Sequence, residues 1–338
     1  VSDETASLLA EKAEGWIVGL RLAALSIRLL SDDQAFAQRF RGTRSALIVE
    51  YLLSEVLARQ SPEIQDFALR TSVLDRFCAP LCQVLTEIPA ERSQQIIDRI
   101  DGANLFVVPL DEEGKWYRYH HLFRDLLRPR LAKQYGTTVV SEFHARVSAW
   151  YAENGWIDEA LDHLLAANHQ TAAAGLVARH RTEMLNQARW SRLERWVRRF
   201  SPDVIDQYPD LLILKTWLLY HQTRFAELPA SLERLEASLA RVALAPETLD
   251  YLQGEMDAVR SLLAYLAVDA RATIIHAQGS LEKTRPDLWI VRSLARLTLA
   301  LALQMEGDLP GAYAAIHDGF AQEEVSSPAF KATLLVTA

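Results

Sequence analysis

The most unusual polar pair in the sequence is His120-His121, where an alternating aromatic run meets a helical pattern. Adjacent residues at such a junction point in different directions, so joint binding of one metal ion is not expected. A helix N-terminus with a nearby imidazole favours an anion such as phosphate. The structural alternative is that one imidazole caps a helix beginning at Leu122 while the other packs on Tyr119.

A second candidate is a basic helix at residues 189–199, in a chain whose formal net charge is −8. Arg192, Arg195 and Arg199 share one helical face. A solvated face over a packed stripe explains this pattern, and a patch for an acidic partner or an anionic ligand is the alternative. Large aromatics at helical spacing are usually core, but rigid aromatics also line recognition sites. The candidate effector surface therefore comprises Trp190, Trp196, Trp217 and Tyr220.

Sequence patterns for catalysis are absent. The chain contains no Gly-x-x-x-x-Gly-Lys-Ser/Thr loop, no Gly-x-Ser-x-Gly elbow and no His-Glu-x-x-His. The two cysteines, Cys78 and Cys82, cannot build a disulfide framework, and two buried, reduced thiols are expected. The sequence therefore predicts no catalytic residue, no metal site and no cofactor held by this chain alone.

Composition is that of a globular protein, and 338 residues suggest two or three domains. The acidic balance argues against a nucleic-acid footprint along the whole chain, which would be basic. No apolar run approaches the roughly 20 residues needed to span a bilayer, so a cytoplasmic protein without a membrane contact is expected. The chain begins at Val1, within a helical pattern, which favours a piece of a larger protein.

Short mixed elements are predicted for the first part of the chain. Apolar spacing indicates helices at residues 8–30, 45–59, 80–86 and 91–100. Ser61-Pro62-Glu63 supplies an N-cap, a first-turn proline and an acid, which predicts another helix start. A hairpin at 105–120 turns at 111–114, and a further helix should end at Pro129. This order predicts a winged-helix domain at residues 46–132.

Winged helices often bind DNA through a helix in the major groove. The corresponding helix here carries only Arg92 and Arg99, against Glu91 and Asp98. The hairpin tip, 111–113, is acidic and would face phosphates with like charge. The sequence therefore predicts no DNA binding by this domain.

The remaining residues, 133–338, are predicted to form helix pairs. Proline followed by an acid recurs at intervals of roughly 40 residues, and these helix starts are Pro209-Asp210, Pro246-Glu247, Pro286-Asp287 and, with proline alone, Pro328. Turns within the units are expected at 155, 223–224, 269 and 307–308, and residues 329–338 suggest an unpaired first helix. The predicted fold is mostly α, a winged helix followed by a TPR-like right-handed α-solenoid.

Two segments carry a resemblance to a known family. Residues 13–24, AEGWIVGLRLAA, and 116–127, WYRYHHLFRDLL, resemble the large ATP-dependent LuxR-type transcription activators of the MalT type, which are STAND-class signalling ATPases. The resemblance covers about residues 1–170. It implies a P-loop ATPase domain, a helical arm (here residues 1–45), a winged helix, a TPR-like sensor and a C-terminal DNA-binding helix-turn-helix.

Particular residues follow from this resemblance. Gly15 to Leu20 is similar to the Gly-Leu-Pro-Leu motif of the arm, with Trp16 and Ile17 replacing the usual residues. Tyr119-His120-His121 resembles the Met-His-Asp motif, which implies that His120 contacts the ADP phosphate in the complete protein and that His121 replaces the Asp.

The family's biology is likewise implied by the resemblance. ATP and ADP would be cofactors of the complete protein, and a small-molecule or protein inducer would bind the helix array. The activated complete protein would self-associate. The alternative function is an α-solenoid scaffold that binds a protein partner without a nucleotide switch.

Overall fold

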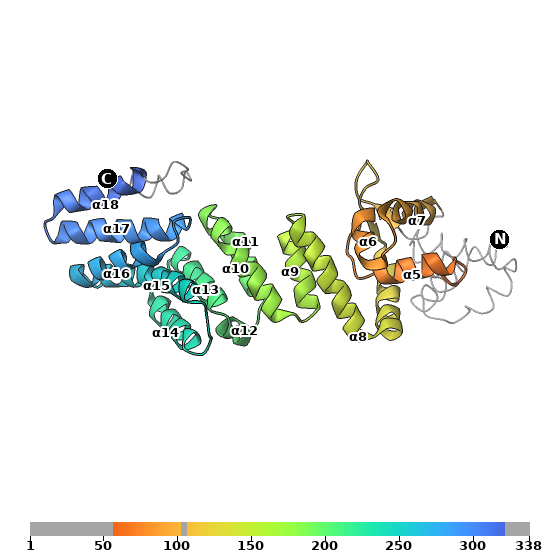
Figure 1. The fold of residues 1–338 in the computed structure, drawn as a ribbon, viewed down its shortest axis with the longest axis horizontal. Helices are drawn as coiled ribbons and strands as arrows, with labels where there is room; N and C mark the ends of the chain where they lie inside the picture. The colour runs from red at the N-terminus through yellow and green to blue at the C-terminus, as the bar shows by residue number, and fades with distance from the viewer. Residues whose placement is uncertain (1–56, 103–106, 322–338) are drawn as a thin grey trace, which may run out of the picture. The chain divides into compact units, whose positions relative to one another are not determined.

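The computed structural model describes residues 57–102 and 107–321, and Figure 1 shows that these are almost entirely helical. The predicted helical arm at 1–45, with its helix at 8–30 and its motif at 15–20, lies outside the described residues. So do most of the helix at 45–59, the hairpin residues 105–106, Pro328 and the segment 329–338. The chain divides into two compact units between Asn168 and His169. Among the described residues, no helix is both long and apolar enough to cross a membrane.

The part of the first unit that the structure describes contains three short helices, a hairpin, a long helix and one further helix. Its elements are α5 (Pro62–Thr71), α6 (Ala79–Thr86), α7 (Ala90–Gly102), β1 (Val107–Pro109), β2 (Tyr117–Tyr119), α8 (His121–Glu153) and α9 (Ile157–Ala166). The predicted helix start at Ser61 is confirmed, because its hydroxyl accepts the Ile64 N–H at 3.4 Å. This order confirms the winged-helix fold.

The wing is a small antiparallel sheet. Val107 pairs with Tyr119 and Pro109 with Tyr117. The Asp111 carboxylate holds the turn by accepting the N–H groups of Lys115 at 2.8 Å and Trp116 at 3.0 Å. Phe77 adds a third line of pairing, since it exchanges two backbone hydrogen bonds of 2.8 Å with Tyr117.

Helix α8 corrects the prediction that the helix ends at Pro129. The helix continues through this proline and breaks at Gly136, whose φ of 79° and ψ of 161° are non-helical. Buried Phe123, Leu127 and Leu131 on either side of the proline pack into the unit, and this packing offsets one missing backbone hydrogen bond. The predicted boundary at 132–133 lies within α8.

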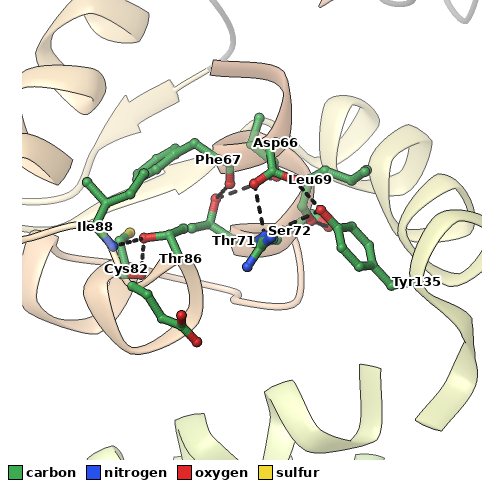
Figure 2. A network of polar contacts seen from close by, with 12 residues as sticks. Asp66, Phe67, Leu69, Thr71, Ser72, Cys82, Thr86, Ile88 and Tyr135 are labelled. Atoms are coloured by element: carbon green, nitrogen blue, oxygen red, sulfur yellow. Dashed lines mark hydrogen bonds and ion pairs between the residues drawn. The ribbon is translucent and has the colours of Figure 1, made fainter. Parts of the chain in front are cut away.

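Polar side chains complete the core of the first unit. Figure 2 shows the hydroxyls of Thr71 and Thr86 donating to the carbonyls of Phe67 and Cys82, at 2.7 and 2.9 Å. The hydroxyl of Tyr135 on α8 donates to Asp66 on α5, so these two helices are joined directly. Both predicted buried thiols, Cys78 and Cys82, are free and buried, and burial raises their pKa.

Every element that the structure describes after α9 is helical. The elements are α10 (Gln170–Asn186), α11 (Trp190–Arg198), α12 (Pro202–Gln207), α13 (Pro209–His221), the 3₁₀ turn η1 (Phe225–Glu227), α14 (Leu228–Leu239), α15 (Pro246–Leu266), α16 (Ala270–Lys283), α17 (Trp289–Met305) and α18 (Leu309–Ala321). Consecutive helices pack as pairs, including α13 with α14, α15 with α16 and α17 with α18. Together with the winged helix, this confirms the predicted mostly α architecture.

The predicted helix starts at Pro209 and Pro246 are confirmed, and so are the turns at Thr223 and Gly307, where φ is 57° and 82°. The predicted start at Pro286 is wrong, because Pro286 lies in a turn and α17 begins at Trp289. The physical reason is a distant cap: the side-chain oxygen of Asn186 accepts the Trp289 N–H at 3.0 Å.

Candidate functional site

The candidate anion site lies where β2 meets α8. Tyr119 is the last residue of β2, and its hydroxyl is 2.7 Å from the Thr71 hydroxyl in the core. Its ring packs against Phe77 and Phe123, with centroids 4.7 and 5.5 Å away. Because the backbone just before His120 is anchored on three sides, the position of His120 is well defined.

His120 occupies the N-cap position of α8 and is half-buried. Its imidazole makes no capping hydrogen bond, so the sequence-based alternative of an imidazole cap is wrong. Instead the ring packs against His121, with centroids 4.4 Å apart. Burial, followed by the nearby charges of His121 and Arg118, lowers the pKa of His120. A neutral imidazole at a helix start can donate one N–H to an anionic oxygen.

The arginines near this junction divide into two kinds. Arg124 and Arg128 of α8 both bind the Asp75 carboxylate, at 2.9 and 3.0 Å, and Arg124 also lies 3.6 Å from Asp125, so each has a carboxylate partner within the unit. Arg118 is exposed on β2, because side chains alternate along a strand and its neighbours Tyr117 and Tyr119 point inward. Arg118 is therefore the cation best placed to join His120 at a ligand phosphate.

The described residues around this junction do not form a cluster of metal-ligating side chains. In the part of the chain that the structure describes, no group of three or more His, Cys, Asp or Glu residues could hold a metal ion. The adjacent His120 and His121 rings pack against each other with their planes tilted by 33°, which is not a chelating arrangement.

The predicted effector surface is only partly on the surface. Trp196 and Trp217 are fully buried, because they fill the packing between helices of the second unit. Trp190 is half-buried and stacks on the exposed His221 ring, with centroids 4.4 Å and planes 9° apart. Tyr220 is half-buried against Trp217, and burial raises its pKa. Of these four aromatics, only Trp190 and Tyr220 are partly accessible; Tyr220 is near the C-terminal end of α13, and Trp190, the first residue of α11, stacks on His221 at that end.

The basic helix has the arrangement of a solvated face over a packed stripe. Leu193 and Trp196 are buried, whereas Arg195 is exposed. The Arg192 guanidinium lies 5.3 Å from the Trp196 ring centroid, and Arg198 pairs with Glu194 at 2.7 Å. These contacts favour the structural explanation of the basic face.

Sequence reasoning missed a buried charge cluster in the second unit. Arg181 binds Glu255 through two nitrogens, at 3.0 and 2.6 Å, and Asp210 at 3.3 Å, while Trp217 donates to Glu255 at 2.8 Å. Burial opposes the charge of Arg181, but Glu255 and then Asp210 outweigh it and raise its pKa. The available signal was helical spacing, which puts Arg181 in register with buried Val177 and Leu185.

Comparison with known proteins gives consistent matches. Residues 53–139 match the family described as MalT winged helix domain. The chain is 32% identical over 259 residues to the serine/threonine-protein kinase PknK of Mycobacterium tuberculosis, covering 77% of this chain and 23% of that protein. It is 30% identical over 259 residues to the HTH-type transcriptional regulator MalT of Yersinia enterocolitica, covering 76% and 28%. It is 29% identical over 265 residues to MalT of Serratia proteamaculans, covering 78% of this chain and 29% of that protein. The chain spans about a quarter of these relatives' length.

Proposed function

This chain is a MalT-like protein that carries a MalT winged helix domain at residues 53–139, and from this premise we propose that it is the regulatory part of a larger signalling protein. The observation that carries the proposal is that about three quarters of this chain is matched by relatives named as a kinase and as transcription regulators. A region common to both does not itself determine the output. The role of this chain is therefore to sense a signal and to pass it to the rest of the protein. In a MalT-like protein, the process regulated in this way is transcription.

The relay begins at His120. In the complete protein, the imidazole of His120 donates to a phosphate of bound ADP, and the winged helix thereby holds the inactive state. The support is its place at the N-terminus of α8, beside exposed Arg118, with Tyr119 anchored in the core. In this proposal, ATP and ADP are cofactors of the complete protein, and His120 is the residue that contacts the bound nucleotide.

The test is ADP binding by the complete protein with His120→Ala. Loss of one hydrogen bond to a charged phosphate should weaken ADP binding by about tenfold, measured by calorimetry. Lys133→Ala is the matched control, because Lys133 is an exposed cation farther along the same helix. Unchanged ADP affinity in His120→Ala would contradict the nucleotide role and favour a scaffold without a switch.

The 338-residue chain itself should not turn over ATP, because its sequence holds no phosphate-binding Gly-x-x-x-x-Gly-Lys-Ser/Thr loop. A phosphate-release assay on the purified chain checks this. ATP turnover that persists through repeated purification would contradict a purely regulatory role.

The helix pairs of the second unit are the proposed binding region for an inducer, a small molecule or a protein. Trp190, stacked on His221, and Tyr220 are its accessible aromatic contacts. Inducer binding would shift the complete protein from a closed, ADP-bound monomer to an ATP-bound, self-associating form. The winged helix does not bind DNA in this proposal.

A thermal-shift screen with sugars, phenolics and small peptides tests this region, since a ligand that binds only the folded state raises its melting temperature. A ligand found in this way should lose its shift in Trp190→Ala. Tyr313→Ala is the control, because Tyr313 is another exposed aromatic, on α18. A shift that survives Trp190→Ala and Tyr220→Ala would place the inducer elsewhere.

A further inference from the structure

Helix α10 makes contacts that a linear array of helix pairs does not require. In such arrays each unit contacts its sequence neighbours. The first helices of the successive pairs, α13, α15 and α17, pack in a row, α13 against α15 and α15 against α17. α10 packs against α13 and also reaches α17. Figure 1 shows the start of α17 next to the turn that joins α10 to α11.

The first long-range contact is the buried ion pair. Arg181 in α10 binds Glu255 in α15, and the side chains are only 8% and 1% exposed. The second carboxylate, Asp210, and the Trp217 indole both come from α13. One guanidinium therefore joins α10 to two members of the row, with its charge matched by carboxylates from both.

The second contact lies at the C-terminal end of α10. Asn186 accepts the N–H of Trp289 at 3.0 Å and donates to the carbonyl of Asp287. Leu288, the N-cap residue of α17, cannot cap with its apolar side chain and makes no such bond. The first turn of α17 is thus capped by a residue of α10, which joins α10 to the third member of the row.

Both long-range contacts are polar, and this determines how they can open. Separating an apolar interface exposes hydrophobic surface, whereas separating an amide or a charged group from its partner gives groups that water or a ligand can bind. A buried ion pair defines one geometry well but adds little net stability compared with apolar packing. The contacts of Arg181 and Asn186 therefore define one closed geometry, and they open only where water or a ligand binds both separated partners.

We propose that α10 is a clasp that closes over the row formed by α13, α15 and α17, and that its two contacts, Arg181 with Glu255 and Asn186 with the start of α17, open together. The closed clasp covers the part of the row that contains Glu255 and Trp217. Opening it uncovers a carboxylate and an indole N–H for a ligand. This goes beyond the proposed function, and its test needs neither nucleotide nor inducer.

The test compares Arg181→Lys and Asn186→Ala in the whole chain by hydrogen–deuterium exchange. Arg181→Lys keeps the charge but loses the two-pronged bond to Glu255. If the contacts open together, amides in the first turn of α17 should exchange about tenfold faster in this variant, the factor that corresponds to one lost hydrogen bond. Unchanged exchange at the start of α17 in Arg181→Lys would overturn the clasp.

A double-mutant cycle provides the second measurement. If both contacts hold the same closed state, each lost contact lowers the free energy of one opening, so their effects on exchange at α17 multiply. The double variant Arg181→Lys/Asn186→Ala should therefore exchange about a hundredfold faster at α17, the product of two tenfold effects. Exchange equal to that of Asn186→Ala alone would show that the contacts open independently and would contradict the proposal. Gln187→Ala is the matched control and should leave α17 unchanged, because the Gln187 side chain bonds Glu183 within α10. If Arg181→Lys fails to fold, Asp210→Asn, which neutralises the more exposed carboxylate partner of Arg181, takes its place in the cycle.

Discussion

Tyr119 determines the geometry of the candidate anion site at the scale of single residues. It does not contact the proposed ligand, but its hydroxyl meets that of Thr71 and its ring lies between Phe77 and Phe123. Burial raises its pKa, so the hydroxyl keeps its proton and its hydrogen bond. Tyr119, the residue before His120, is thus a core residue that also fixes the position of the candidate anion site.

Tyr119→Phe should lower the free energy of unfolding by about 1 kcal/mol, because a buried hydrogen bond is lost while the ring stays. Urea denaturation followed by circular dichroism measures this. Tyr117→Phe is the comparison, and it should cost less, since its hydroxyl bond to Gln94 is longer, at 3.3 Å, and partly exposed. Equal losses in the two variants would show that the Thr71 bond has no special weight.

A second residue-scale feature is an imidazole pair in the first unit. His144 in α8 and His163 in α9 meet through their Nδ1 atoms at 2.8 Å. One nitrogen must donate and the other accept, so a second proton would set two N–H groups against each other. Burial, and then the charge of His144, lowers the pKa of His163 from 6.5 to about 4. Tyr151 stacks on His163, and Arg128 and Asp75 also act on the pair.

The sign of the pH dependence follows from this lowered pKa. Below pH 6.5 the unfolded chain binds a proton at His163 that the folded protein does not bind. The free energy of unfolding is therefore highest above pH 6.5 and decreases as the pH falls towards 4. Between pH 7 and pH 5 the first unit should lose roughly 2 kcal/mol of stability. Urea midpoints across this range measure it. His163→Asn, which keeps a hydrogen-bonding atom near Nδ1, should flatten the profile, and an unchanged slope in that variant would assign the effect to other groups.

At the scale of elements, the approach of α15 to the end of α16 depends on a glycine. A Cβ at Gly254 would lie 2.7 Å from both the backbone nitrogen and the hydroxyl of Thr284, and backbone cannot move aside cheaply. Gly254→Ala should therefore cost about 1–3 kcal/mol, as overpacking usually does. Thermal denaturation measures the loss.

Gly175→Ala is the matched helix substitution with the opposite expected sign. A Cβ there would meet only the end of the Arg179 side chain, at 3.8 Å. Alanine should add about 0.5–1 kcal/mol through its better helix propensity. A loss of stability at Gly175, or a gain at Gly254, would contradict this account of the helix spacing.

Local patterns predicted elements well wherever the cause was local. The helix starts at Ser61, Pro209 and Pro246 were predicted from caps and proline within their own first turns, and the structure has them. The start at Pro286 was wrong because Asn186, far away in sequence, supplies the cap at Trp289. The burial of Trp196 and Trp217 could not be predicted either, since helical spacing gives a face but not what covers it.

At the scale of the whole molecule, charge placement argues against DNA binding. Arg92 of α7 is bound by both oxygens of Glu63, at 3.0 and 2.7 Å, so its charge is matched within the unit. Glu112 and Glu113 are exposed at the tip of the wing, and the chain carries a net charge of −8. The tip of the wing is therefore acidic and the charge of Arg92 is already paired, which disfavours contact with DNA phosphates there.

The chain should consequently give no binding to duplex DNA, even at low salt, in a fluorescence anisotropy titration. Glu112→Lys/Glu113→Lys should produce weak, strongly salt-dependent binding, because it reverses the charge at the tip. Specific, salt-resistant binding by the unaltered chain would contradict the regulatory assignment of this winged helix.

The break in α8 has a mechanical consequence. The helix consists of two rods that meet at Gly136, in a backbone geometry that glycine adopts readily. Two consecutive residues, Asp75 and Arg76, contact these two rods. Asp75 binds Arg124 and Arg128 of the first rod, and the carbonyl of Arg76 accepts the hydroxyl of Tyr151 in the second, at 3.3 Å.

Arg76 also contacts α9, because its guanidinium pairs with Glu159 and lies 4.1 Å from the Trp156 ring centroid. Rotation of the two halves of α8 about Gly136 would therefore have to break either the Asp75 contacts to Arg124 and Arg128 or the contact between Arg76 and Tyr151.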